Sequence, residues 1–411
     1  MASMRPSPLA RTAGIVFLLA FLVRLAALVS LGPRVQSLEE ERMGDARDYK
    51  SIARNWSLGY PHVLDPGEER PNGSNRAPLY PLLLSLATRS QDETWFGGRL
   101  LGCIAGAALA AACVFLANRA AGKGSEMIAG LLCCLYPFLI LYSLLILTET
   151  LFSLFLTASL FFWCAARGSG GARTTAFLGL SLALSALTRP VVLLLPLVVC
   201  ADLYLSRKKG RQVLLLCVTF VSSLLPYLAW QRVQYGSWIP ITTEGGRSFY
   251  QGNNPMNQSG GAIRGVDYDY PEWTEQMSEP ASSRALMAEG LRYVLDRPFL
   301  FLQRGIRKIG RLWAVFPSQA SGFDTPWMAL ANASIVLPIY GLALAGMVST
   351  RKEWRRQLPL YAVILYTTLF CAVFTGSQRF RLPLMPCLSV WAAVPLKSLI
   401  AAACKRTPRT P

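Results

Sequence analysis

Long apolar runs separated by short polar segments make up almost the whole chain. The first run, TAGIVFLLAFLVRLAALVSLG, has about the 20 residues that an α-helix needs to cross the hydrocarbon core of a bilayer. No polar linker divides the chain into soluble domains, so the pattern predicts one all-α transmembrane bundle over residues 1–411. About ten spans are expected in this polytopic integral membrane protein, the others near residues 98–117, 126–142, 150–166, 174–188, 191–205, 212–230, 327–347, 358–375 and 383–400.

Two features lie inside these runs. A signal peptide also begins with a basic segment and an apolar run, but this run is long, so we interpret it as a retained first helix. Arg24 within it is expected to snorkel or to face a polar interior.

Gly98, Gly102 and Gly106, spaced by four residues, predict one helix face that allows close packing.

The short loops fix the expected orientation. With the N-terminus inside, every inner segment is basic: NRAAGK, ARGSGGAR, SRKKGR, STRKEWRR and the tail CKRTPR. The outer side then receives two long loops, 33–96 and 231–326, which are rich in Gly, Pro, Asn, Tyr and Trp. Loops of this length are usually functional or disordered, and their aromatic content argues against disorder. We expect them to carry amphipathic helices and the chemistry.

Composition agrees with a membrane protein. The chain is 53% hydrophobic and 16% charged, with a net charge of +18. In a soluble protein this excess would suggest nucleic acid, but here basic inner loops explain it, and we expect no nucleic-acid partner. The ten cysteines lie mostly in apolar runs, which predicts no disulfides, and the only histidine is His62. We expect no bound metal and no cofactor.

Polar residues near the start of the first loop are the first candidates for chemistry. In GDARDYKSIARNW, Asp45 and Tyr49 are four residues apart, so one helical turn places them on one face. The alternative is that Asp45 only caps an amphipathic helix. Further on, Arg76 precedes Pro78 in RAPLYP, where an extended or re-entrant entry to the membrane is expected, with Tyr80 at the interface.

Charged residues at helix ends supply a second group. Glu149 lies between apolar runs, where it is either a functional group at membrane depth or part of a Thr-Glu helix cap. Arg189 in TRP stands at the outer end of a span. In YQGNNPMNQSGG, the amides of Asn253 and Asn254 are candidates for sugar binding, although turn formation alone explains the segment.

Basic residues on the predicted outer side oppose the charge bias of the rest of the chain. The segment 297–311 is basic and amphipathic, and SQRFRLP adds Arg379 and Arg381 before the last span. Binding a phosphate at the membrane surface is a function that justifies these cations. We expect Lys308 to point inward to the phosphate, with Arg304 and Arg311 facing lipid headgroups or carboxylates. The alternative is a cluster that only binds anionic lipids.

Together these motifs resemble the GT-C superfamily of membrane glycosyltransferases, in particular the bacterial branch related to protein mannosyltransferases and the lipid A aminoarabinose transferase. The resemblance runs in order from about residue 12 to residue 400. The sequence departs from the protein mannosyltransferases at Ala46, where they have Glu, and from the aminoarabinose enzymes at Asp48, where they have Arg. The matching residues are Asp45, Tyr49, Ala53, Gly59, Arg76, Pro78-Leu79-Tyr80, Arg99, Glu149, Thr188-Arg189-Pro190, Gly252 to Pro255 and Arg379 to Pro383.

The resemblance implies an inverting hexosyl- or pentosyltransferase in the bacterial inner membrane, with its active site on the periplasmic or outer side. The donor would be a polyprenyl-phosphate sugar and the acceptor a hydroxyl of a lipid, polysaccharide or protein. Asp45 would act as general base. The remaining matched side chains and the outer cations would bind substrate. A transporter or flippase of lipid-linked sugars is the alternative, against which stand the long outer loops and the lack of a repeat.

Overall fold

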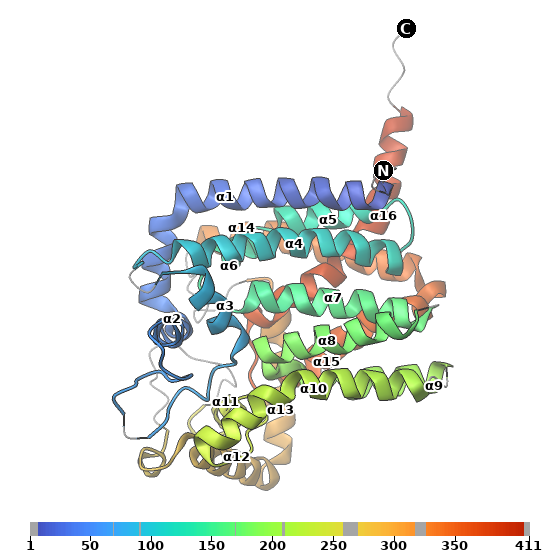
Figure 1. The fold of residues 1–411 in the computed structure, drawn as a ribbon. Coiled ribbons are helices and arrows are strands. Elements are labelled where there is room, and N and C mark those ends of the chain that lie inside the picture. Colours follow the sequence, from blue (N-terminus) through green and yellow to red (C-terminus); the bar gives the residue numbers. More distant parts are fainter. Residues whose placement is uncertain are drawn as a thin grey trace.

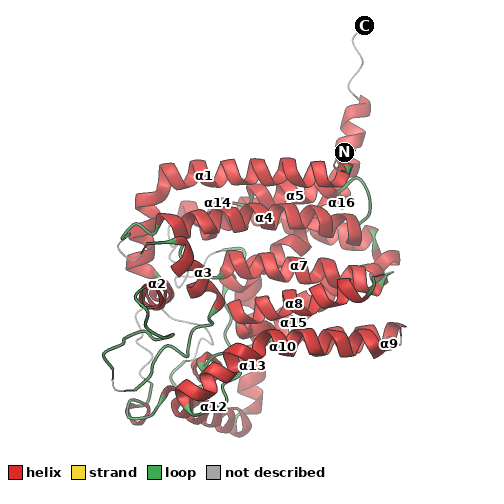
Figure 2. Cartoon of the chain, viewed as in Figure 1, coloured by secondary structure: helices red, strands yellow, loops and turns green. Residues whose placement is uncertain are grey.

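The structure, a computed structural model, describes residues 7–68, 70–89, 92–168, 170–207, 210–257, 270–316 and 326–406. Every regular element in these ranges is a helix, and none of the described residues forms a strand (Figure 2). Residues 258–269 and 317–325 of the predicted second loop lie outside the described residues, as do 208–209 and 407–411 of the basic inner segments.

The expected spans all coincide with helices, and the chain is an all-α integral membrane bundle. Among the described residues, seven helices are long and apolar enough to cross a membrane, or eight if a bent pair is one span. α8 and the segment Pro190–Ser206 are apolar but shorter, so the expected number of about ten is not confirmed. The bundle helices are α1 (Pro8–Arg42), α4 (Phe96–Ala120), α5 (Glu126–Leu135), α6 (Pro137–Leu144), α7 (Glu149–Arg167), α8 (Ala172–Thr188), α9 (Leu195–Arg207), α10 (Gly210–Tyr235), α14 (Pro326–Ser349), α15 (Trp354–Val373) and α16 (Met385–Arg406).

The segment predicted as a single span near 126–142 is instead the bent pair α5 and α6, with an angle of 55° between them. Pro137 explains the break, because it has no N–H to donate into the preceding turn. Arg24 on α1 compensates: its Nη1 donates to the carbonyls of Ala20 and Cys134, the latter at the break, over 3.1 and 3.3 Å. Arg24 is fully buried and faces this polar break rather than water.

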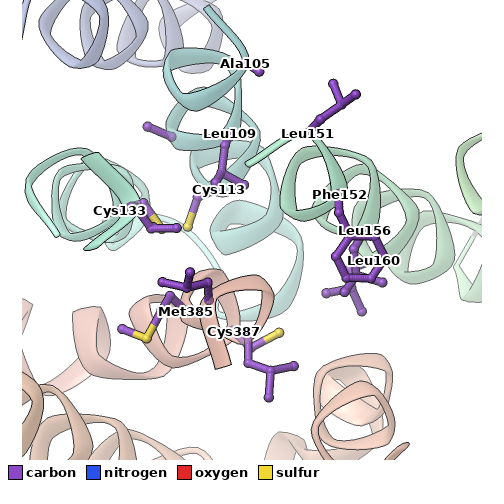
Figure 3. Packing of buried hydrophobic residues seen from close by; sticks show 14 of the residues in the cluster. Ala105, Leu109, Cys113, Cys133, Leu151, Phe152, Leu156, Leu160, Met385 and Cys387 are labelled. Carbon is purple, nitrogen blue, oxygen red and sulfur yellow. The ribbon is translucent and has the colours of Figure 1, made fainter. Parts of the chain in front are cut away.

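Close packing of α4 depends on its glycines. A Cβ built on Gly98 would lie 2.3 Å from Leu84, and one on Gly102 would lie 2.1 Å from the backbone oxygen of Ser143. A Cβ on Gly106 would lie 2.4 Å from Arg24. The predicted small-residue face is therefore confirmed. Elsewhere α4 packs with α5, α7 and α16 through interleaved apolar and thiol side chains, including Leu109, Cys113, Cys133, Leu156 and Cys387 (Figure 3).

The polar segments gather at one end of the bundle, which we call the loop end (Figure 1). α1 continues to Arg42, past the predicted start of the first loop at residue 33, and then turns into α2. The two predicted loops contribute short helices here, and two 3₁₀ turns from the bundle meet them. These elements are α2 (Gly44–Ser57), α3 (Leu79–Ala87), η1 (Pro190–Val192), α11 (Glu244–Gly252), α12 (Glu279–Asp296), α13 (Pro298–Trp313) and η5 (Gln378–Leu384).

Candidate functional site

A cavity of about 1180 Å³ opens at the loop end. Its lining carries five arginines and two carboxylates together with apolar and aromatic side chains. A space of this size with few charged groups on an otherwise apolar surface is typical of a ligand site. The charged lining residues are Asp45, Arg76, Arg189, Glu244, Arg311, Arg379 and Arg381, and the apolar ones include Phe138, Val191, Leu193, Leu194, Tyr366, Phe370, Phe374 and Phe380.

A continuous chain of ion pairs forms one side of this site. Arg76 Nη2 lies 2.8 Å from Asp48 and 2.9 Å from Asp45. The other oxygen of Asp45 lies 3.0 Å from Arg379 Nη1.

Arg379 also binds Glu149 Oε1, over 2.6 Å, and the same oxygen lies 2.9 Å from Arg189. Three arginines therefore alternate with three carboxylates that come from widely separated parts of the chain. Both oxygens of Asp45 are occupied by guanidinium groups.

α2 holds Asp45 at the cavity. The apolar face of α2, with Ala46, Tyr49, Ile52 and Ala53, is buried, which leaves the first turn to face the arginines. Met43 is the N-cap of this helix and makes no side-chain cap bond. The alternative in which Asp45 caps the helix is thus wrong for this structure, because its carboxylate binds Arg76 and Arg379 instead.

Arg76 is held by aromatic and backbone contacts. Its guanidinium lies 5.5 Å from the ring centre of Tyr49, a cation–π contact. The ring of Tyr49 in turn meets Tyr80 edge-on at 5.4 Å. The carbonyl of Arg76 is 3.0 Å from His62 Nε2. Tyr49 lines the cavity, whereas Tyr80 is buried behind it and supports the wall rather than contacting a ligand.

Glu149 and Arg189 form the deep end of the ion-pair chain. Glu149 opens α7 and is 1% exposed, and the N-cap Thr148 makes no side-chain cap bond. Glu149 therefore has a buried carboxylate that is paired with Arg379 and Arg189. Arg189 ends α8 in an extended conformation imposed by Pro190, and its guanidinium lies 5.2 Å from the ring centre of Phe380.

The η5 turn carries the last two expected arginines. Ser377 caps it by accepting from the N–H of Arg379 over 3.3 Å. Arg381 Nη1 donates to the carbonyl of Ala314 and to the hydroxyl of Tyr340, over 2.7 and 2.8 Å. Both arginines line the cavity, Arg379 near Asp45 and Arg381 on the side of α13 and α14.

Burial and ion pairing shift the pKa values of the site residues in opposite directions. Burial raises the pKa of Asp45, but Arg76 and Arg379 together lower it by more, so that it lies below its ordinary value. Burial lowers the pKa of Arg76, and Asp45 with its neighbours raises it above its ordinary value. Paired in this way, Asp45 is an ionised partner of two arginines and a poor proton acceptor.

Lys308 and the Asn pair lie outside the cavity lining. Lys308 is fully buried, and its Nζ donates to Asn253 Oδ1 and to the carbonyl of Val373, over 3.0 and 3.3 Å. Asn254 closes its own turn by accepting from the N–H groups of Met256 and Asn257. Turn formation thus explains the GNNP segment in this structure, and Lys308 braces that turn rather than pointing to a phosphate.

The helix expected over 297–311 is present as α13. Arg304 is 3% exposed and donates to the carbonyl of Asn254, so it contacts a backbone group and not the headgroups or carboxylates that we expected. Arg311 lines the cavity. The exposed residues of α13 include the apolar Phe299, Leu302 and Ile306 as well as the polar Gln303 and Arg307.

Arg99 is also placed away from the cavity. It is 3% exposed at the start of α4, where Nη1 donates to the carbonyl of Leu144 over 2.6 Å and lies 3.3 Å from Glu39. Glu39 additionally pairs with Lys50 and accepts from the N–H of Ile146 over 2.7 Å. This buried cluster joins the end of α1 to α2, α4 and the α6–α7 connection, which is a structural role.

Sequence reasoning missed two features of the site. Glu244, at the start of α11, lines the cavity near Arg76, and no local motif marked it. Asp48 was noted only as a departure from relatives, yet it binds Arg76 over 2.8 Å. Within the described ranges, no three His, Cys, Asp or Glu side chains are grouped as metal ligands would be.

Comparison with known proteins defines the fold. No protein-family model matches the sequence, and no curated protein sequence matches it. The apo structure of the Archaeoglobus fulgidus oligosaccharyltransferase is similar, with a TM-score of 0.58 and 12% identity over 98% of this chain and 52% of that chain. Its complex with Zn and sulfate gives a TM-score of 0.55 and 14% identity over 95% and 50%.

This chain spans about half the length of the oligosaccharyltransferase. ArnT from Cupriavidus metallidurans bound to undecaprenyl phosphate is also similar, with 14% identity over 94% of this chain and 81% of that chain. Its TM-score of 0.43 is too low to support an argument. The similarity shows that this chain shares the fold of about half of the oligosaccharyltransferase.

Proposed function

We propose that this protein is a glycosyltransferase that moves a sugar from a polyprenyl-phosphate carrier to a hydroxyl acceptor on the outer face of a bacterial inner membrane, with inversion. The observation that carries the proposal is the cavity at the loop end. Its lining presents Asp45 between two arginines and also many apolar side chains. A phosphate joined to a long hydrocarbon chain is the ligand whose two parts suit these two kinds of lining.

The arginines form the phosphate site in this proposal. Five arginines line the cavity against two carboxylates, which leaves an excess of positive charge. Arg379 and Arg76 stand beside the proposed base, where the leaving phosphate gains negative charge as its bond to the sugar breaks. Arginine suits this role because its planar fork matches two phosphate oxygens at once. Arg311 takes the place that the sequence suggested for Lys308.

The apolar part of the lining provides a path for the lipid. Val191, Leu193 and Leu194 follow the end of α8, and Tyr366 of α15 donates to the carbonyl of Val191 over 2.7 Å. Leu194 lines the cavity and is 61% exposed. In a bilayer that surface meets acyl chains, so a polyprenyl chain can enter between these elements without crossing water.

Asp45 takes the proton in this mechanism. The acceptor oxygen attacks the anomeric carbon, the bond from that carbon to the phosphate oxygen breaks, and the hydroxyl proton passes to Asp45. The polyprenyl phosphate leaves with the bonding electrons. As the phosphate draws Arg76 and Arg379 toward itself, the pKa of Asp45 rises from its lowered value, so the donor itself prepares the base.

Transfer by the purified protein tests the proposal. Undecaprenyl-phosphate sugars and whole envelope material, lipids included, from a strain lacking this gene would be incubated with the protein in detergent, and products identified by mass spectrometry. We expect a glycosylated acceptor and free undecaprenyl phosphate, and no product with Asp45→Asn. Movement of the lipid-linked sugar across proteoliposomes with no covalent product would instead support the alternative, a flippase.

A further inference from the structure

A carboxylate outside the ion-pair chain faces the cavity from the second predicted loop. Glu244 opens α11, and Asp45 and Glu244 are the carboxylates of the described cavity lining. Asp45 is bound by two arginines, whereas Glu244 has no salt bridge among the described residues. Its Oε1 accepts from the hydroxyl of Ser248 over 2.8 Å. A carboxylate in such a place, turned to a cavity, is a candidate ligand contact.

The turn before Glu244 has a strained backbone that several hydrogen bonds hold in place. Ile241 has a φ of 76°, which is a rare conformation for a β-branched residue, and it is fully buried. Gln231 fixes it by donating to its carbonyl over 2.9 Å. Thr243 donates its N–H to the carbonyl of Ser74 over 2.9 Å and accepts from Ser283 over 2.6 Å. Strain maintained by so many contacts is typical of a functional site.

The neighbours of Glu244 define what it can bind. The same wall carries Asn75, Thr242, Ser248 and Gln251, which offer neutral donors and acceptors. An ammonium group is disfavoured, because the cavity lining already has an excess of arginine, with Arg76 acting on Glu244 directly. Burial raises the pKa of Glu244. Neutral groups that form hydrogen bonds with its carboxyl group are therefore better partners than cations.

We propose that Glu244, supported by Ser248 and Gln251, binds the hydroxyl groups of the neutral sugar on the donor. This inference rests on the proposed function and deepens it. The arginine side of the cavity takes the phosphate, the apolar side takes the lipid, and the Glu244 side takes the sugar ring. Glu244 is a substrate-positioning residue and not the base, because Asp45 already stands beside the arginines that hold the leaving group.

Binding of two lipids separates the sugar site from the phosphate site. Undecaprenyl phosphate without sugar, and a panel of undecaprenyl-phosphate mannose, glucose and galactose, would be titrated into the full-length protein in detergent. For the sugar lipid that the wild type binds most tightly, we expect Glu244→Ala to weaken binding by roughly 10–100-fold, since it loses a hydrogen bond to a carboxylate. Binding of bare undecaprenyl phosphate should stay within about twofold of wild type.

Two further variants complete the design. Glu244→Gln keeps one acceptor and should lose roughly 3–10-fold in sugar-lipid binding while retaining measurable turnover. Glu289→Ala, an exposed glutamate on α12, is the matched control and should behave as wild type. Equal losses for both lipids, or no loss for either, would overturn the inference without refuting the proposed function. Failure of the wild type to bind undecaprenyl phosphate at all would instead refute the proposed function.

Discussion

Replacing Asp45 by Asn should slow transfer and strengthen phosphate binding at the same time. The carboxylate of Asp45 occupies guanidinium groups of Arg76 and Arg379, at 2.9 and 3.0 Å. An amide keeps the shape of the side chain but can neither take a proton nor hold both cations. Loss of a general base typically slows turnover by about 10²–10⁴-fold.

The fold should survive this change, because each arginine keeps a second partner. Arg76 retains Asp48 at 2.8 Å, and Arg379 retains Glu149 at 2.6 Å. The amide oxygen can still accept from one arginine, so the loss amounts to one charge-assisted contact, about 1.5–3 kcal/mol. The freed donors become available to a phosphate. Undecaprenyl phosphate should therefore bind roughly tenfold more tightly to Asp45→Asn, since 1.4 kcal/mol is a factor of ten.

Turnover, thermal unfolding and lipid titration on one detergent preparation would check these three effects. Asp48→Asn is the control, since it also releases Arg76 but leaves the base in place. We expect it to reduce turnover by less than about tenfold, well short of the loss of a general base. Near-normal turnover by Asp45→Asn would refute its role as base. A slower enzyme that also binds undecaprenyl phosphate more weakly would refute the competition between Asp45 and the phosphate.

Three further predictions concern packing, pH and orientation. Gly102→Ala should destabilise the protein by about 1–3 kcal/mol, because its Cβ would lie 2.1 Å from the backbone oxygen of Ser143. Gly14→Ala is the control in the same thermal unfolding experiment, because a Cβ there meets nothing within 4 Å. Burial lowers the pKa of Lys308 from 10.5 to about 8, so the unfolded chain binds more protons between these values. The free energy of unfolding should therefore rise with pH above about 8, and Lys308→Met should abolish that rise in denaturation curves. In intact cells, with the native exposed cysteines replaced, Asp65→Cys should react with an impermeant thiol reagent and Arg173→Cys should not.

The sequence predicted the helices better than their breaks. Apolar runs located every bundle helix, because a span must be apolar along its whole lipid-facing length. The break between α5 and α6 was missed although Pro137 marked it, since a run of apolar residues continues through it. The carbonyl it frees is satisfied by Arg24, more than a hundred residues earlier in the chain, and local sequence does not reveal such a partner.

The same distinction applies to the candidate site residues, some of which lie at the cavity while others do not. The ordered motifs identified Asp45, Arg76, Glu149, Arg189 and Arg379, which the structure brings together. Other charged residues that look equally functional in the sequence bind protein groups far away in the chain and do not line the cavity. Sequence position shows that a charge lies near the membrane, but only the fold shows whether another side chain or a cavity faces it.

The case of Arg99 and Lys308 illustrates this limit. Arg99 pairs with Glu39, and Lys308 with the side chain of Asn253, both across long separations in sequence. Each cation is therefore neutralised or solvated within the fold and has no need of a ligand. Glu244 shows the opposite error: it has an ordinary loop sequence around it, and its importance appears only from its position in the cavity.

The alternation of charge at the site has a physical reason in a membrane protein that must exist without its ligand. Several arginines held near the bilayer without partners would be costly, and a site built for phosphate needs them. Pairing Arg76, Arg189 and Arg379 with carboxylates reduces that cost, and in the proposed mechanism one of these carboxylates, Asp45, is the base. In that mechanism the phosphate would displace Asp45 from its arginines, so binding the donor and activating the base would be one event. If this is correct, a phosphate analogue should raise the pKa of Asp45, whereas a neutral lipid of equal chain length should not. The pH dependence of carboxylate labelling at Asp45, measured with and without undecaprenyl phosphate, would show this shift. An unchanged profile would mean that the arginines hold Asp45 throughout the reaction and that another group accepts the proton.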